Sequence, residues 1–452
     1  MRTVNITCEN THQEYEIELG TTLRDVKKII FPENHNHILG ALVNNQLQDL
    51  QFVVMTPLRV NFIDVTTLDG YSVYSRSLIF VLYQAVAQLF PKKTLRAEYF
   101  ISNGIFCRIV NKEIVLTPAI ISELENKMKE ISKFSSSEMI DYTLKNNKNT
   151  IISIAVYDEN GITYNIYGGE YNLNYDYEIG SATKTFTAML ISRAVEEGKI
   201  NLDDNISNYL ELENRYYPTI KRIITHTSGF KPYYLSFQKI KNYFSGGNDF
   251  YNISKEQLLK ELNKTKLEDK DYDFNYSNFG ISTLGLILEK VYYKDYNELQ
   301  EEYFKELDMN NTSVAIGKGN LRGYWKWNED DGYIPTGAII SNIEDMSKYL
   351  ETLITSDESY IIKTQEPLTD VRAVNDIYNI FDINVDKVGM TWMIDNKNDI
   401  IWHNGSTTNF NSYIGYNKEK KVGVVVLSNL SPKSDVNMTF IGNKILHEML
   451  DK

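Results

Sequence analysis

A serine and a lysine stand three residues apart in the segment EIGSATKTFTAML, which runs from Glu178 to Leu190. The apolar residues around the pair predict a helix, and residues three apart on a helix share a face, with Cβ atoms about 5–6 Å apart. An ammonium is costly to bury in such a helix unless it has a partner or a task. The pair therefore indicates that Lys184 activates Ser181.

The position of Ser181 at the start of the helix adds a second element. Its backbone amide belongs to the N-terminal donors that have no partner inside the helix. Those donors and the helix dipole can stabilise a developing oxyanion. Lys184 can accept or relay the serine proton if burial lowers its pKa. An SxxK pattern alone arises by chance in most chains of this length, so it needs support from elsewhere.

The first supporting segment is DFNYSNFGIS, which places Tyr276 and Asn278 in a loop directly before an amphipathic helix. A phenol beside an ammonium can act as a general base when its pKa falls. An amide two residues further can point the same way and bind a substrate carbonyl. Taken alone, this segment is better interpreted as an exposed turn, because the chain is rich in tyrosine, with 32 in all.

The second supporting segment is WHNGSTTNF, in which His403, Asn404 and Gly405 end a predicted strand. Glycine lets a ligand approach the backbone there. The amide of Ser406 could complete an oxyanion hole opposite that of Ser181. A lone histidine on a strand is usually structural, so this segment gains weight only together with the other two.

Taken in chain order, SxxK, YxN and HxG resemble the serine β-lactamase and penicillin-binding-protein superfamily. The resemblance is greatest to the class C enzymes, D-Ala-D-Ala carboxypeptidases and related esterases. It covers about residues 150–450 and extends to the linking segments IITHTSGF, LDMNNTSV, PTGAIISNIEDMSKYL and GYNKEKKVGVVVLSN.

The resemblance implies a role for each residue. Ser181 is expected to be the acylated nucleophile, with Lys184 and Tyr276 sharing the general-base work. Asn278 is expected to orient the acyl amide. The amides of Ser181 and Ser406 are expected to form the oxyanion hole. Together with Asn278, the residues of the third segment are expected to bind the substrate: His403, Asn404, Gly405 and Ser406. No metal or cofactor is expected.

The third motif departs from the superfamily pattern. Lactamases usually carry K-T-G there, whose ammonium and hydroxyl attract a substrate carboxylate, whereas this chain has His403 and Asn404. Several peptidases and esterases of the superfamily also have histidine at this place. An unperturbed histidine has a pKa near 6.5, so its attraction for a carboxylate should be weak and should fade as the pH rises. Efficient turnover of β-lactams is therefore not expected.

Other constellations favour no competing chemistry. His226, in THTSGF, is interpreted as a turn and packing residue. The pair His35 and His37 has no Cys or carboxylate at ligand spacing, so no metal site is expected there. The sequence has no G-x-S-x-G, no P-loop and no G-x-G-x-x-G, which excludes an α/β-hydrolase elbow and a kinase.

The elements that must position these motifs can be read from the pattern. TIISIAVYDENGITYNIYGGEYNL predicts two or three strands that meet at the turn DENG. The helix with Ser181 and Lys184 should stop at Gly198. After a helical middle third, runs between Met390 and Asn429 predict an antiparallel sheet, followed by a final helix, NMTFIGNKILHEML. Segregated sheet and helices indicate an α+β domain.

Residues 1–62 combine short alternating strands with one helical segment, TTLRDVKKII, and predict a small β-grasp-like module. A helix, SRSLIFVLYQAVAQLF, should end at Pro91. ISNGIFCRIV predicts two strands around a turn at Gly104. TPAIISELENKMKEISK predicts a helix capped by Thr117, with Pro118 at its first position.

Residues 1–62 look like a TGS domain, and residues 63–133 are similar to the second small domain of threonyl-tRNA synthetases. The same pair precedes the kinase in some uridine-kinase-like proteins. The synthetase helix carries an HxxxH pair where this chain has Tyr74 and Leu78. Without those imidazoles, a metal-assisted editing site is not expected.

The net charge of −13 is unevenly distributed along the 452 residues. Residues 1–133 hold 14 Lys+Arg and 14 Asp+Glu, so the rest hold 33 and 46, which accounts for the whole −13. This shift and the polar segment KFSSSE place a boundary near Lys133. Neither part is basic, which argues against an electrostatic nucleic-acid surface.

The localisation signals are few. The first residues alternate like a strand and lack the apolar region of a signal peptide. No run approaches 18 apolar residues, so no membrane span is expected. Two cysteines are too few for a disulfide framework and suit a reducing compartment. We expect a cytoplasmic protein.

The sequence thus predicts an α+β multidomain chain. A β-grasp-like module (1–62) and an α/β module (63–133) precede a β-lactamase-like domain (134–452) with an antiparallel sheet flanked by helices and a helical region. The leading hypothesis is a serine hydrolase that attacks an amide, ester or lactam in a small-molecule or peptide substrate. The alternative is a catalytically weak or inactive binding or regulatory protein whose TGS-like half contacts RNA or a nucleotide. The natural substrate and the oligomeric state stay open.

Overall fold

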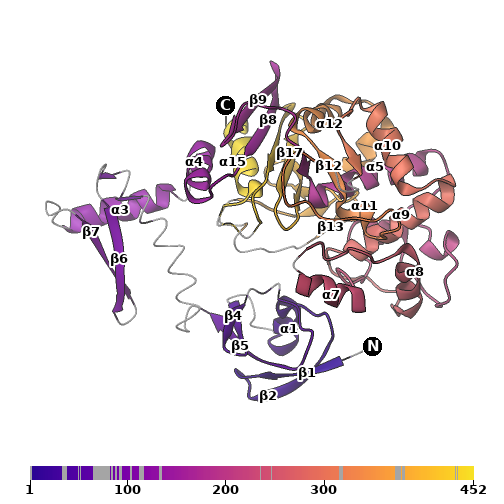
Figure 1. Ribbon diagram of the computed structural model, residues 1–452, viewed down its shortest axis with the longest axis horizontal. Coiled ribbons are helices and arrows are strands. Elements are labelled where there is room, and N and C mark those ends of the chain that lie inside the picture. The colour runs from indigo at the N-terminus through magenta and orange to yellow at the C-terminus, as the bar shows by residue number, and fades with distance from the viewer. Residues whose placement is uncertain are drawn as a thin grey trace. The chain divides into compact units, whose positions relative to one another are not determined.

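In the computed structural model the chain forms two compact units, Met1–Phe134 and Ser135–Lys452 (Figure 1). The structure describes residues 3–32, 38–48, 50, 52–64, 82, 85–86, 89–90, 94–101, 104–110, 117–131, 135–234, 236–245, 247–314, 319–371, 378, 382–432, 434 and 436–451.

The N-terminal unit begins with a five-stranded sheet in the order β2-β1-β5-β3-β4. β1 and β5 run parallel, and the other neighbouring pairs run antiparallel. Helix α1 contributes apolar side chains to the same core as the sheet. The predicted β-grasp-like module is therefore confirmed. Its elements are β1 (Thr3–Cys8), β2 (Gln13–Glu18), α1 (Leu23–Ile30), β3 (Ile38–Val43), β4 (Gln46–Gln48) and β5 (Leu58–Asp64).

The second part of this unit contains a hairpin, β6 (Thr94–Ile101) and β7 (Gly104–Val110), and helix α3 (Pro118–Ile131). Thr117 caps α3, because its hydroxyl accepts a hydrogen bond from the Ile120 amide at 3.3 Å. The predicted pair of strands and the predicted Thr117 cap are therefore confirmed. Most of the helix expected before Pro91 lies outside the described residues, and so do Tyr74, Leu78, His35 and His37.

The C-terminal unit is built on an eight-stranded sheet in the order β13-β14-β15-β16-β17-β18-β8-β9. All of its neighbouring strands are antiparallel. The predicted DENG turn joins β8 to β9, and the predicted C-terminal meander supplies β15 to β18. The strands are β8 (Ile152–Asp158), β9 (Gly161–Tyr167), β13 (Thr369–Asp370), β14 (Lys387–Val388), β15 (Met393–Asp395), β16 (Ile400–Ser406), β17 (Asn411–Asn417) and β18 (Val422–Ser428).

Helices cover both faces of this sheet, as the positions of α12 and α15 in Figure 1 indicate. α12 (Ile343–Thr355) packs on β8 and β18, and α15 (Met438–Leu450) packs on β17 and β18. A Cβ on Gly423 would touch Leu350 of α12, whereas one on Gly442 of α15 would touch Tyr413. Because side chains alternate along a strand, this assigns the two helices to opposite faces.

A helical region lies beside the sheet, with α5, α9, α10 and α11 gathered together (Figure 1). A small three-stranded sheet has the order β10-β12-β11, and its strand β10 comes directly before the turn η1 that leads into α5. The remaining elements of the unit are α4 (Ser136–Asn146), β10 (Tyr177–Glu178), η1 (Gly180–Ala182), α5 (Thr183–Glu196), η2 (Ile206–Asn208), α6 (Ile220–Ile224), α7 (Phe237–Ser245), α8 (Lys255–Lys264), α9 (Asn278–Tyr292), α10 (Tyr296–Glu306), β11 (Ser313–Val314), α11 (Ile334–Gly337), β12 (Ile339–Ser341) and α13 (Ser359–Gln365).

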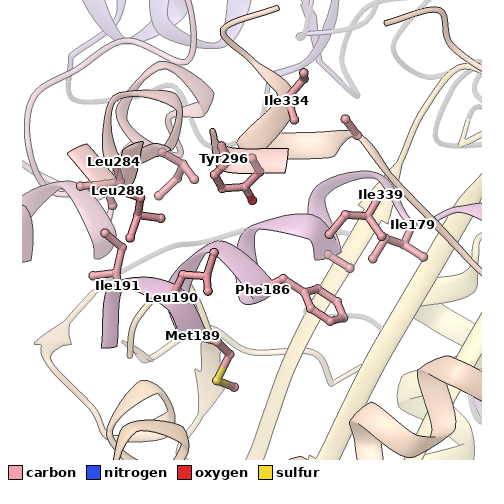
Figure 2. Close-up of a cluster of buried hydrophobic side chains, with 14 of the residues drawn as sticks. Ile179, Phe186, Met189, Leu190, Ile191, Leu284, Leu288, Tyr296, Ile334 and Ile339 are labelled. Carbon is pink, nitrogen blue, oxygen red and sulfur yellow. The ribbon is translucent and has the colours of Figure 1, made fainter. Parts of the chain in front are cut away.

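Helix α5 runs through the middle of this region, and every residue from Thr183 to Ser192 is buried (Figure 2). It contacts α9, α11 and α13, and Phe186 stacks on Tyr349 of α12 with ring centroids 4.1 Å apart. A helix that is buried all round is fixed by packing in every direction. Any functional side chain at its N-terminus is therefore held on a rigid support. Gly198, with φ +69°, follows the end of the helix as predicted.

Candidate active site

Ser181 and Lys184 lie together at the start of α5. Ser181 is in the short helical turn η1, and Lys184 is in the first turn of α5. The Nζ atom of Lys184 lies 2.9 Å from the Ser181 Oγ atom. It also donates a hydrogen bond to the carbonyl oxygen of Thr336 in α11, at 2.8 Å. The helical spacing thus brings the two side chains into direct contact, as the sequence predicted.

The burial of Lys184 determines its protonation. The side chain is fully buried, and this burial lowers its pKa well below the usual value. A neutral amine can keep its bond to the Thr336 carbonyl and offer its lone pair to the serine hydroxyl. Lys184 therefore has the position and the electrostatic environment of a general base for Ser181.

The backbone of β16 is packed directly over the serine turn. A Cβ on Gly405 would lie 1.8 Å from the Ile179 carbonyl oxygen, and one on Gly180 would lie 2.5 Å from the Ser406 amide nitrogen. Only glycine fits at these two contacts, and Gly180 also has a φ of +51°. The amide of Ser406 is thus brought next to the turn that carries Ser181. This is the arrangement needed for a two-amide oxyanion hole.

Tyr276 is the third functional side chain at this place. The Lys184 amine lies 4.9 Å from the centroid of its ring. Burial raises the pKa of the Tyr276 phenol far above its usual value, and the nearby Ser181 hydroxyl offsets only part of this rise. The buried hydroxyl makes no direct hydrogen bond to another described residue. The expected fall in the pKa of this phenol is therefore not found, and the phenol is neutral near pH 7.

His403 faces the same site from β16. Its ring lies 6.2 Å from the Tyr276 ring, centroid to centroid. Its Nδ1 atom donates a hydrogen bond to the Asn404 carbonyl oxygen at 2.6 Å. Burial first, and then the nearby Lys184, lower the pKa of His403 to about 3. The imidazole is therefore neutral at every pH near 7. The fading charge that was expected for an unperturbed histidine does not arise.

The structure does not bring the Asn404 side chain to this site, in contrast to the expectation. Its amide nitrogen donates to Tyr378 Oη at 3.1 Å and to Thr439 Oγ1, on α15, at 2.9 Å. Successive side chains on a strand point to opposite faces, so Asn404 faces α15 while His403 and Gly405 face the serine turn. The side chain of this motif residue therefore points away from the serine turn.

Asn278 is the first residue of α9, two residues after Tyr276, and its side chain is half-buried. The cap of α9 is Ser277, whose hydroxyl accepts a hydrogen bond from the Gly280 amide at 3.0 Å and donates to the Lys231 carbonyl at 2.6 Å. This cap fixes where α9 begins. It therefore also fixes the place of Tyr276 and Asn278 relative to each other.

Most of the chain is similar to known proteins. The family model described as Beta-lactamase matches residues 143–442.

The chain belongs to the beta-lactamase family.

Protein flp from Staphylococcus aureus (strain MRSA252) is 26% identical over 275 residues, which cover 56% of this chain and 53% of flp. The chain thus spans about half the length of the curated relatives it matches. The octameric penicillin-binding protein homologue from Pyrococcus abyssi superposes with a TM-score of 0.58 at 24% identity, covering 70% of this chain and 76% of that one. A beta-lactamase/D-alanine carboxypeptidase from Yersinia pestis gives 0.57 at 16% identity, covering 70% and 98%.

Two buried acid–base residues of this beta-lactamase-family chain were not singled out from the sequence as functional. Glu178, just before the serine turn, is 1% exposed, and its carboxylate accepts hydrogen bonds from the Trp325 amide and the Thr407 hydroxyl, both at 2.6 Å. His226 is fully buried against Tyr276. Neither stands at a motif spacing, so only the fold reveals them.

Within the described residues, no group of three or more His, Cys, Asp and Glu side chains could hold a metal ion. Among the described helices, none has the length and apolarity that a membrane crossing requires.

Proposed function

We propose that this protein is a serine hydrolase that forms a covalent acyl-enzyme at Ser181 and prefers esters or amides that carry no essential carboxylate. One observation carries the proposal: a fully buried lysine amine, with its pKa lowered, lies 2.9 Å from the serine hydroxyl. A lysine held in this way has the geometry and the basicity of a catalytic base.

Acylation follows from these positions. The Lys184 amine takes the proton from Ser181 Oγ while Oγ attacks the substrate carbonyl carbon. The carbonyl oxygen becomes an oxyanion, which the amides of Ser181 and Ser406 stabilise. When the bond to the leaving group breaks, its oxygen or nitrogen gains a proton. Tyr276 can donate that proton, because its phenol is neutral, and Lys184 can then reprotonate Tyr276.

Deacylation reverses the order with water as the nucleophile. Lys184, neutral again, takes a proton from water as the water attacks the acyl carbon, and Ser181 Oγ leaves with a proton. Asn278 is placed at the start of α9, two residues from Tyr276, and we assign it the binding of the acyl amide. No step calls for a cofactor.

The substrate preference rests on His403. A lysine at this place would keep a full positive charge at pH 7 and would attract a substrate carboxylate. His403 is neutral, since burial lowers its pKa to about 3. Asn404, which replaces a hydroxyl residue, faces α15 instead. The third motif therefore supplies neither the charge nor the hydroxyl, which disfavours penicillins and cephalosporins relative to neutral esters.

The test is covalent labelling of the purified full-length chain with a fluorophosphonate probe. The parent should be labelled and should hydrolyse p-nitrophenyl acetate, whereas Ser181→Ala should do neither, because loss of a nucleophile costs several orders of magnitude in rate. Ser406→Ala is the matched control, since its exposed side chain is removed and its amide is kept. It should label like the parent.

Two outcomes would contradict the proposal. Labelling of Ser181→Ala at the parental rate would mean that another serine is activated. A folded parent that resists the probe would favour the alternative, in which the hydrolase fold is kept for its shape and the β-grasp-like part contacts RNA or a nucleotide.

A further inference from the structure

His226 lies in the loop after α6, in the segment THTSGF, and is fully buried. Its backbone has a φ of +59°, in the left-handed region that residues other than glycine rarely adopt. Such a conformation is strained and persists only where surrounding contacts determine it. The His226 amide donates to the Ile223 carbonyl oxygen at 3.0 Å, and three further contacts are made with one neighbouring segment.

That segment is Asn275–Ser277, at whose centre stands Tyr276. The His226 carbonyl oxygen accepts a hydrogen bond from the Asn275 amide at 2.8 Å. Its Nδ1 atom accepts one from the Ser277 amide at 3.2 Å. Its ring lies on the Tyr276 ring, with centroids 4.5 Å apart and a tilt of 38°. One residue thus holds the backbone on both sides of the tyrosine and the face of its ring.

The protonation of His226 suits this task. Because Nδ1 accepts a hydrogen bond, the ring proton of the neutral form lies on Nε2. The titratable groups that face it are Lys184 and His403, and both, after burial itself, lower the pKa of His226 well below its usual value. A proton on Nδ1 would break the bond to the Ser277 amide. The imidazole therefore stays neutral near pH 7, and its Nδ1 atom continues to accept the hydrogen bond from the Ser277 amide.

We propose that His226 is a positioning residue for acyl transfer, which sets the place and tilt of Tyr276 beside Lys184 and acts on the reaction only through that tyrosine. The inference rests on the proposed function. It differs from a general packing role, because packing would affect the fold and the substrate affinity without depending on the Tyr276 hydroxyl.

Two substitutions separate the contacts of His226. His226→Phe keeps a ring against Tyr276 but removes the Nδ1 acceptor. His226→Asn keeps an acceptor of similar reach and tolerates the left-handed backbone, but removes the ring. A variant that fails to fold is recognised by its circular dichroism and melting temperature, and the other one then carries the test.

The decisive measurement is a double-mutant cycle on the full-length chain. Kinetic constants for p-nitrophenyl acetate and rates of fluorophosphonate labelling are measured for each His226 variant, with Tyr276 intact and with Tyr276→Phe. With Tyr276 intact we expect kcat to fall about 10-fold to 100-fold, as for a misplaced catalytic group, and KM to change little. With Tyr276→Phe, the same substitution should change kcat less than about twofold, because the group it positions is absent.

A matched control is His447→Phe. His447 lies on α15, and its Nε2 atom, like that of His226, is buried and makes no hydrogen bond to another described residue. Its substitution should leave kcat and KM unchanged. Equal losses of kcat from the His226 variants in both tyrosine backgrounds would overturn the inference, and so would folded His226 variants with the kcat of the parent. A parent that does not label at Ser181 would instead overturn the proposed function, and the inference with it.

Discussion

The carboxyl group of Glu178 gives a prediction whose size follows from the structure. It is buried beside the serine turn, and its hydrogen-bond donors are the Trp325 amide and the Thr407 hydroxyl. Burial raises the pKa of Glu178 from 4.5 to about 7, and the two hydrogen bonds offset only part of the rise. We predict that Glu178→Gln makes the protein more stable relative to the parent as the pH rises from 4.5 to 7.5.

The sign follows from proton binding. Between pH 4.5 and 7 the native carboxyl holds its proton while the unfolded one has lost it, so the native state binds more protons. The contribution of Glu178 to stability is therefore fully present below pH 4.5 and is lost as the pH rises through 7. One pKa unit corresponds to 1.36 kcal/mol, so a rise from 4.5 to about 7 corresponds to about 3 kcal/mol.

Glutamine removes the ionisation and can keep both contacts. Its carbonyl oxygen can accept from the Trp325 amide, and its amide nitrogen can donate to the Thr407 oxygen. The difference in unfolding free energy between Glu178→Gln and the parent should therefore grow by about 3 kcal/mol from pH 4.5 to 7.5. For a unit of about 300 residues, an unfolding entropy near 2.1 cal/mol/K per residue converts this into about 4–5 °C in melting temperature.

The assay is differential scanning calorimetry of both full-length proteins at half-unit pH steps from 4.5 to 8.5. Other carboxyl groups with raised pKa values, such as Asp331, are present in both proteins and cancel in the difference. A difference in melting temperature that stays constant across the range would refute the reasoning. It would show that the Glu178 carboxylate finds compensation for its burial, and that its pKa is close to that of an exposed carboxyl.

Four further predictions concern the site and the two units. Lys184→Met, which keeps the volume of the side chain but removes the base, should lower the rate of fluorophosphonate labelling by at least about three orders of magnitude; labelling within tenfold of the parent would assign the base elsewhere. Gly405→Ala should lower both the melting temperature and kcat, because its Cβ would lie 1.8 Å from a carbonyl oxygen, and a neutral outcome would show that β16 can shift without cost. The kcat/KM for nitrocefin divided by that for p-nitrophenyl acetate should be low in the parent and should not titrate with His403 between pH 6 and 9. In His403→Lys this ratio should rise. A high ratio in the parent would mean that another residue supplies a positive charge. Residues 135–452 alone should keep esterase activity within a few-fold of the full chain, and an insoluble or inactive fragment would contradict the independence of the two units.

Local patterns in the sequence were enough to predict the elements that carry the site. The alternation around DENG and through VGVVVLSN predicts strands, and the apolar run after Ser181 predicts the buried helix α5. The spacing of Ser181 and Lys184 predicts their contact, because residues three apart on a helix meet on one face. These inferences succeed because they depend on neighbours within a single turn, hairpin or helix.

The tertiary structure decided everything that depends on residues far apart in the chain. Strand register turns Asn404 toward α15 and His403 toward Tyr276, although the two are adjacent in sequence. Burial sets the direction of each pKa: it lowers those of Lys184 and His403 and raises that of Tyr276. Desolvation is the sum of all the atoms that exclude water from a group, and those atoms come from many separate segments. A sequence pattern can therefore indicate a candidate base, but the pKa of that base depends on the packed fold.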